Sequence, residues 1–245
     1  MLLLLAAACA TALATGLGAL PVYWLGARAD ALQPTLWGIV AGVMGVASVQ
    51  GLLLPALDEG TPAEVLAGLA VGVGFLLAAR AALSGRDVAV GDVRGAGARR
   101  AILVVGVLFV HSLPEGFALG TAWASDTVGL GLFVFLAIAV QNVPEGTATA
   151  IPLRETGMGP LRAFWTATFT SLPQPVGALA AFALVETVGG LLPASFGFAA
   201  GAMLALIVFE VLPAVGARDA RAPAAVSALV SAAVMVGLGL ALEVG

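Results

Sequence analysis

The sequence predicts an all-α, polytopic membrane protein with eight transmembrane helices, in a single transmembrane domain over residues 1–245. Hydrophobic types make up 61% of the chain and charged types only 10%, whereas about a quarter of a soluble domain is charged. The mean hydropathy is +1.09. The chain also contains repeated apolar stretches, each about 20 residues long, which is the length that crosses a bilayer as a helix. This composition excludes a soluble enzyme, a disordered chain and a nucleic-acid-binding protein.

Eight apolar stretches follow one another with short connections. They cover residues 2–25, 32–56, 63–83, 101–122, 128–151, 162–185, 190–212 and 223–243. Charged residues, glycine or proline interrupt the apolar pattern between consecutive stretches, which leaves no room for a soluble domain. The longest connection, 84–100, is rich in glycine and charge, and we expect it to be a mobile cytoplasmic loop.

The charges predict how the chain is oriented. With eight spans, all ten arginines fall on one side of the membrane. The other side carries only acids: Asp58, Glu59, Glu64, Asp126, Glu186 and Glu243. Because connections rich in Lys and Arg stay in the cytoplasm, we expect a multi-pass protein of the cell (inner) membrane with both termini outside the cytoplasm.

Weak internal symmetry predicts a transporter architecture. Residues 37–44 of span 2 resemble residues 196–203 of span 7, and residues 111–116 of span 4 resemble residues 141–146 of span 5. Each pair of spans crosses the membrane in opposite directions. We therefore expect spans 1–3 and 6–8 to form an inverted repeat around spans 4 and 5, an arrangement found in transporters.

Two glutamates lie near the middle of spans 4 and 5. An ionised side chain at the bilayer centre costs about 2.5–3.5 kcal/mol, so Glu115 and Glu145 need compensating partners. His111 precedes Glu115 by four residues, and Gln141 precedes Glu145 by four, which places each pair on one helical face. If the two faces meet, one imidazole, two carboxylates and one amide converge. Such a ligand set suits Zn²⁺, Fe²⁺ or Mn²⁺.

Three further polar or sulfur-bearing side chains are weaker candidates. Gln174 stands between Pro173 and Pro175 in span 6, a pattern typical of broken transporter helices. Glu210 lies toward the cytoplasmic end of span 7. Met44 of span 2 offers a thioether, although a methionine in an apolar helix usually serves packing.

These motifs resemble the ZIP (Zrt/Irt-like) family of divalent metal transporters, in its prokaryotic branch. Residues 137–146 are similar to the family's fifth helix, 172–178 to its sixth and 200–210 to its seventh. The resemblance covers essentially the whole chain. It implies a homodimer that moves metal inward by alternating access.

The resemblance also implies a set of metal-binding residues. A first site would use Met44, His111, Glu115, Gln141 and Glu145. A second site would add Ser112, Asn142 and Gln174, with both glutamates bridging the two metals. The family often carries Asn at the position of Ser112, Asp or Asn at that of Asn142, and Glu at that of Gln174. We therefore expect the second site to be weak or absent. Glu210 matches an acid on the family's exit route.

The sequence therefore predicts a transporter that moves a zinc-like divalent metal into the cytoplasm through a site between spans 4 and 5. The metal is its transported substrate (Zn, with Cd, Fe, Mn and Co as alternatives), and no catalytic cofactor is expected. The expected partners are the metal ion, the lipid bilayer and a second copy of the chain, without nucleic acid. Two alternatives remain open: an intramembrane metal-dependent hydrolase, since one His and two Glu are enough ligands for a catalytic zinc, and a metal sensor of the same family that transports little.

Overall fold

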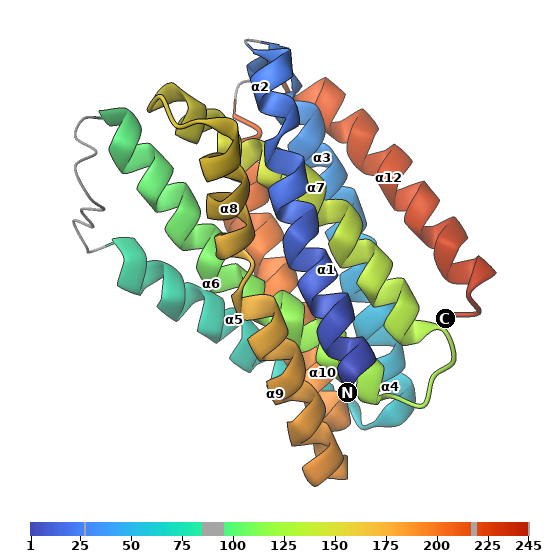
Figure 1. The fold of residues 1–245 in the computed structure, drawn as a ribbon. Coiled ribbons are helices and arrows are strands. Elements are labelled where there is room, and N and C mark those ends of the chain that lie inside the picture. The colour runs from blue at the N-terminus through green and yellow to red at the C-terminus, as the bar shows by residue number, and fades with distance from the viewer. Residues whose placement is uncertain (27, 85–95, 217–219, 245) are drawn as a thin grey trace.

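Helices make up nearly all of the structure (Figure 1). The computed structural model describes residues 1–26, 28–84, 96–216 and 220–244. Within these residues, eight helical segments are long and apolar enough to cross a membrane. The predicted all-α class and the eight spans are therefore confirmed for the described part of the chain.

Several of the eight spans consist of more than one helical element. Spans 1 to 4 contain α1 (Leu2–Ala19) and α2 (Pro21–Leu25); α3 (Arg28–Ser48), η1 (Val49–Leu53) and α4 (Leu54–Glu59); α5 (Pro62–Ser84); and α6 (Ala96–Ala124). Spans 5 to 8 contain α7 (Leu130–Glu155); α8 (Pro160–Thr170) and α9 (Pro173–Thr187); η2 (Gly189–Leu191), α10 (Leu192–Leu206), η3 (Ile207–Val211) and α11 (Leu212–Ala214); and α12 (Arg221–Ala241).

Some helices extend beyond their predicted apolar cores. Span 2 runs from Arg28 to Glu59, and α6 begins at Ala96. Alanine and arginine have high helix propensity, so a helix need not end where its apolar stretch ends. Of the predicted loop 84–100, residues 85–95 lie outside the described residues, whereas the backbone of residues 96–100 is helical.

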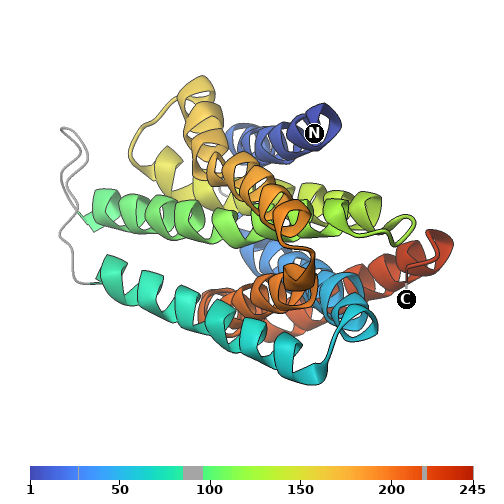
Figure 2. The ribbon, with the colours of Figure 1, turned by 90° about the horizontal axis from the view of Figure 1, so that it is seen from below.

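Spans 4 and 5 lie in the middle of the bundle (Figure 2). α6 packs against α9 and α10, and α7 packs against α1 and α3. One layer beside this central pair contains α1, α8 and α9. The other layer contains α3 packed on α12 and α5 packed on α10. The two helices with the paired Pro-Glu-Gly motifs are therefore covered on both sides.

Glycines allow neighbouring helices to pack backbone against backbone. A Cβ added to Gly38 or Gly42 of α3 would lie 2.2 Å from a carbonyl oxygen of α12. A Cβ on Gly68 or Gly72 of α5 would lie 2.1 or 2.0 Å from a carbonyl oxygen of α10. Small residues four positions apart are typical of close helix packing in membranes, where van der Waals contact replaces the hydrophobic effect between helices.

Three spans are interrupted next to prolines. Span 6 breaks between α8 and α9, and Pro173 is the first residue of α9, so the predicted break beside Gln174 is confirmed. Spans 2 and 7 each contain a π-helical segment, η1 and η3, that ends two residues before Pro55 or Pro213. These matching positions agree with the predicted inverted repeat of spans 1–3 and 6–8, which stays a prediction.

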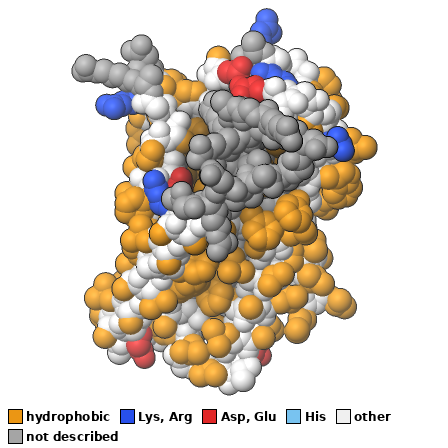
Figure 3. All heavy atoms as spheres, turned by 90° about the vertical axis from the view of Figure 1, so that its left-hand side faces the viewer, with side chains coloured by type: hydrophobic (Ala, Val, Ile, Leu, Met, Phe, Trp, Pro, Cys, Tyr) orange, Lys and Arg blue, Asp and Glu red, His pale blue; other side chains and the backbone are white. Residues whose placement is uncertain are grey.

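Both ends of the chain lie at one end of the bundle, opposite α2 (Figure 1). The face in Figure 3 carries its visible arginine side chains in the upper half, hydrophobic side chains over the middle and acidic side chains at the lower edge as well as near the top. This separation agrees with spans that alternate in direction. The identification of the arginine-bearing end as cytoplasmic still rests on the charge rule.

Candidate metal centre

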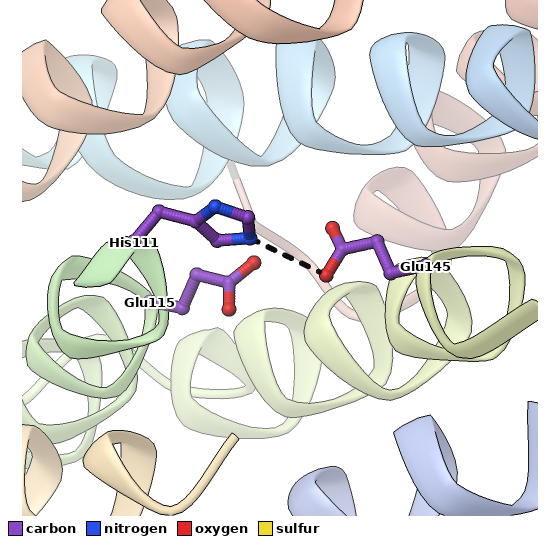
Figure 4. Close-up of side chains that lie close together, drawn as sticks. All are labelled: His111, Glu115 and Glu145. Atoms are coloured by element: carbon purple, nitrogen blue, oxygen red, sulfur yellow. Dashed lines mark ion pairs between the residues drawn. The ribbon is translucent and has the colours of Figure 1, made fainter. Parts of the chain in front are cut away.

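His111, Glu115 and Glu145 converge between α6 and α7 (Figure 4). Each offers one ligand atom, and these atoms all lie within 4.8 Å of one another. His111 Nε2 lies 3.6 Å from Glu145 Oε2, and the side chains are at most 5% exposed. The predicted meeting of the two helix faces is therefore present in the structure.

The proline and glycine of each motif have separate effects. α6 and α7 remain continuous through Pro114 and Pro144, so the missing amide donors do not break either helix. A Cβ on Gly116 would lie 2.0 Å from the Gln174 carbonyl oxygen of α9, and one on Gly146 would lie 1.8 Å from a carbonyl oxygen of α1. Each glycine thus brings an outer helix close to the neighbouring glutamate.

Amide groups hold the carboxylate of Glu115 in place. Gln141 Nε2 donates a hydrogen bond to Glu115 Oε1 over 2.5 Å, and Gln174 Nε2 donates to Glu115 Oε2 over 2.7 Å. Hydrogen bonds to an ionised acceptor are stronger than those between neutral groups. The two amides therefore hold the Glu115 carboxyl group in one orientation inside an apolar bundle.

Four buried polar atoms of the side chains that meet Glu115 lack a hydrogen-bond partner among the described residues. They are both ring nitrogens of His111, Gln141 Oε1 and Glu145 Oε1. Buried polar atoms are normally satisfied, and each unsatisfied one costs about 1–3 kcal/mol. Gln141 Oε1 and Glu145 Oε1 have lone pairs suited to a metal ion, and so does the His111 ring nitrogen that does not carry the proton. The cluster thus has the chemistry of a site for a divalent cation.

Two of the three residues added for the predicted second metal site, Asn142 and Gln174, instead form hydrogen bonds with each other. Gln174 Oε1 accepts hydrogen bonds from Thr11 Oγ1 over 2.8 Å and from Asn142 Nδ2 over 3.1 Å. Asn142 Nδ2 also donates to the Thr11 carbonyl oxygen over 2.7 Å. Ser112 donates to the Leu108 carbonyl oxygen of its own helix. The structure thus brings Asn142 and Gln174 together with Glu115.

Thr11 was not identified from the sequence. Thr11 and Thr15 stand four residues apart on α1, and both are buried. Thr15 shares a hydrogen bond with Ser171, at the break between α8 and α9. Two hydroxyl residues at helical spacing in an otherwise apolar span were the available signal, although Thr in a membrane helix usually bonds its own backbone.

A cavity extends from the cluster to Glu210 on η3. It has a volume of about 230 Å³, and its lining includes His111, Glu145 and Glu210. Apolar side chains from α3, α6 and the segment from α10 to α11 complete its wall. The predicted exit acid therefore lies on the same cavity as two of the predicted first-site ligands.

Glu210 has a basic partner that was not identified from the sequence. Arg80 Nη1 lies 3.2 Å from Glu210 Oε1, although the two residues stand on spans 3 and 7. Among the other predicted ligands, Met44 is fully buried on α3, which packs against α7. The role of Met44 as a metal ligand stays a prediction.

Comparison with known proteins gives consistent matches. A family profile described as ZIP Zinc transporter matches residues 87–243. Zinc transporter GufA of Myxococcus xanthus is 34% identical over 212 residues, which cover 82% of this chain and 83% of that protein. Zinc transporter ZIPB of Bordetella bronchiseptica is 35% identical over 247 residues, which cover 94% of this chain and 78% of that protein. A candidate zinc transporter of Arabidopsis thaliana is 36% identical over 240 residues, which cover 96% of this chain but only 38% of that longer protein.

Proposed function

Because the chain belongs to the ZIP family of zinc transporters, we propose that it carries a zinc-like divalent metal ion across the membrane through the cluster between α6 and α7. Members of this family are transporters and not enzymes, so family membership argues against the hydrolase interpretation. The eight apolar spans make the chain a multi-pass membrane protein.

The observation that carries the proposal is the set of unpartnered ligand atoms in the cluster. His111 Nε2, Gln141 Oε1 and Glu145 Oε1 belong to the side chains that meet Glu115, and none of them has a hydrogen-bond partner among the described residues. Nitrogen and oxygen ligands together suit Zn²⁺ and its first-row neighbours. Zinc is the proposed substrate because the relatives are named zinc transporters. Cadmium, iron, manganese and cobalt are to be compared in the same assay.

Movement toward the cytoplasm is supported by the cavity and the charges. The cavity extends from His111 and Glu145 to Glu210, near the end where α5 ends and where the described arginines gather. Positive connections mark the cytoplasmic side. The proposed orientation therefore places this end in the cytoplasm of a cell whose inner membrane holds the protein, and both termini on the outer side.

Alternating access is supported by where the helices pack most closely. Within the described helices, the glycines that touch a neighbouring backbone join α1 with α7 and α8, α6 with α9, α3 with α12, and α5 with α10. Between these two groups, Gly129 at the start of α7 also lies close to the Leu242 carbonyl oxygen at the end of α12. Gly51 of η1, which faces α7, meets only side chains, those of Phe133 and Val134. We infer that α1, α6, α7, α8 and α9 move as one group against α3, α5, α10 and α12.

The homodimer stays a proposal that follows from family membership. α5 and α12 are the least buried of the described spans, since only 22% and 17% of the residues in their apolar stretches are buried. Their surfaces are therefore open to lipid or to a second copy of the chain. Light scattering of the purified protein in detergent, with the detergent mass subtracted, would give a mass of two chains if the protein is a dimer.

Metal flux into vesicles tests the proposed function. The purified chain is reconstituted into liposomes that hold a zinc-sensitive dye, and Zn²⁺ is added outside. We expect the dye signal to rise faster than in protein-free liposomes. Binding of Zn²⁺ by the purified protein without flux would favour the sensor interpretation instead. Repeating the assay with Cd²⁺, Fe²⁺, Mn²⁺ and Co²⁺ measures the selectivity.

Replacing Gln174 by Glu is expected to add a second metal ion. The wild-type amides of Gln174 and Asn142 satisfy each other and Glu115, so we expect one Zn²⁺ per chain. In Gln174→Glu the hydrogen-bond donor next to Glu115 becomes a carboxylate, and a cation then relieves the repulsion between the two. Elemental analysis after equilibrium dialysis should give about one Zn²⁺ per wild-type chain and about two for the variant. Two ions in the wild type would contradict the weak or absent second site.

A further inference from the structure

The guanidinium of Arg80 joins span 3 to span 7 at the far end of the cavity. Arg80 Nη1 donates a hydrogen bond to the Phe209 carbonyl oxygen over 2.6 Å and lies 3.2 Å from Glu210 Oε1. Its guanidinium carbon also lies 5.9 Å from the centre of the Phe209 ring. One arginine thus contacts a carbonyl, a ring and a carboxylate of the same short segment.

The carbonyl that Arg80 contacts is one that the helix itself leaves open. Phe209 stands four residues before Pro213, and proline has no N–H to donate to that carbonyl. The amide of Leu212 donates to the Ile207 carbonyl oxygen, five residues earlier, in the π-helical geometry of η3. Arg80 therefore donates to a carbonyl oxygen to which Pro213, four residues later, cannot donate.

The carboxylate that Arg80 contacts lines the metal cavity. Glu210 shares the cavity with His111 and Glu145, so a cation that leaves the cluster along this cavity reaches Glu210. There the cation and the guanidinium compete for the same carboxylate oxygens. The pair is partly exposed, with 44% of the Arg80 side chain and 29% of the Glu210 side chain accessible, so the guanidinium has space in which to move aside.

We propose that Arg80 is a positioning residue of the exit route, which pairs with Glu210 and so prevents this acid from retaining the departing metal. Without the arginine, Glu210 is a free carboxylate on a cavity that already holds an imidazole and another carboxylate, a ligand set that retains divalent ions. With the arginine, the positive charge reduces the attraction of Glu210 for a second cation. This inference rests on the proposed function, since it concerns the release step of transport.

The test compares zinc uptake by the full chain in liposomes for the wild type, Arg80→Gln, Arg80→Lys, Glu210→Gln and the double variant Arg80→Gln/Glu210→Gln. We expect Arg80→Gln to lower kcat by roughly tenfold without raising KM, because release is slowed and binding at the cluster is not. Arg80→Lys keeps most of the kcat, since an ammonium group also pairs with a carboxylate. In the double variant the retaining carboxylate is absent, so kcat rises again, to within about twofold of Glu210→Gln.

Arg162→Gln serves as the matched control, because Arg162 is exposed at the start of α8; its kcat should equal that of the wild type. A wild-type kcat in Arg80→Gln would overturn the inference, and so would a double variant no faster than Arg80→Gln, since a merely structural role of Arg80 is not relieved by a second substitution. Wild-type protein that transports no metal would overturn the proposed function and this inference with it. Uptake by the wild type without the predicted recovery would overturn this inference alone.

Discussion

Glu145→Gln is expected to reduce metal uptake by about 100-fold or more. The substitution keeps the size of the side chain and removes the negative charge of the carboxylate that faces His111 across 3.6 Å. A metal site loses about 10- to 100-fold when only a supporting partner is removed, so the loss of an anionic ligand should exceed that range. The initial rate of dye-detected uptake into liposomes, compared at equal amounts of reconstituted protein, measures the effect.

Glu186→Gln is the control for Glu145→Gln. Glu186 is an exposed acid in α9, so the same chemical change there should leave the uptake rate unchanged. The purified Glu145→Gln protein should also bind Zn²⁺ more weakly, which separates a lost ligand from a blocked movement. Wild-type uptake by Glu145→Gln would show that the ion does not use this carboxylate.

Gly146→Ala is expected to destabilise the protein by about 3 kcal/mol, at the upper end of the usual effect of overpacking. The added Cβ would lie 1.8 Å from the Thr15 carbonyl oxygen, which belongs to the backbone of α1. A backbone atom cannot turn away as a flexible side chain can, so α1 and α7 must separate. For a chain of this size, such a loss lowers the melting temperature by about 10 °C. Thermal unfolding of the purified protein in detergent measures it.

Gly74→Ala is the matched control, because a Cβ on Gly74 of α5 would meet nothing within 4 Å. Alanine there should be neutral or stabilise the helix by about 0.4–1 kcal/mol. If Gly146→Ala melted at the temperature of Gly74→Ala, the close approach of α1 to α7 would be wrong, and so would the placement of Thr11 beside the cluster.

The sequence alone predicts the spans and the central cluster because both depend on local patterns. Each span is an apolar stretch of bilayer length, and each buried glutamate is conspicuous because ionised groups are costly there. The four-residue spacing of His111 and Glu115 fixes their common face before any packing is known. The glycine after each glutamate also indicated a close neighbour, although not which helix that neighbour would be.

Contacts between distant spans were not predictable in the same way. In the sequence, Arg80 is one of several arginines at a membrane edge, and nothing distinguishes it from the others. The packing of α5 on α10 brings it to Glu210. In the sequence, Thr11 is a small polar residue in an apolar helix. Its hydrogen bond to Gln174 depends on the approach of α1 to α9. Patterns along one helix show which face is polar, but they do not identify the partner of that face.

Anomalous X-ray scattering from a crystal grown with Zn²⁺ or Cd²⁺ would locate the transported ion that we propose binds between α6 and α7. We expect a strong peak within bonding distance of His111 Nε2 and of carboxylate oxygens from both Glu115 and Glu145. If a preparation that transports the metal gave a peak elsewhere in the membrane region and none between these three side chains, the proposed site would be wrong.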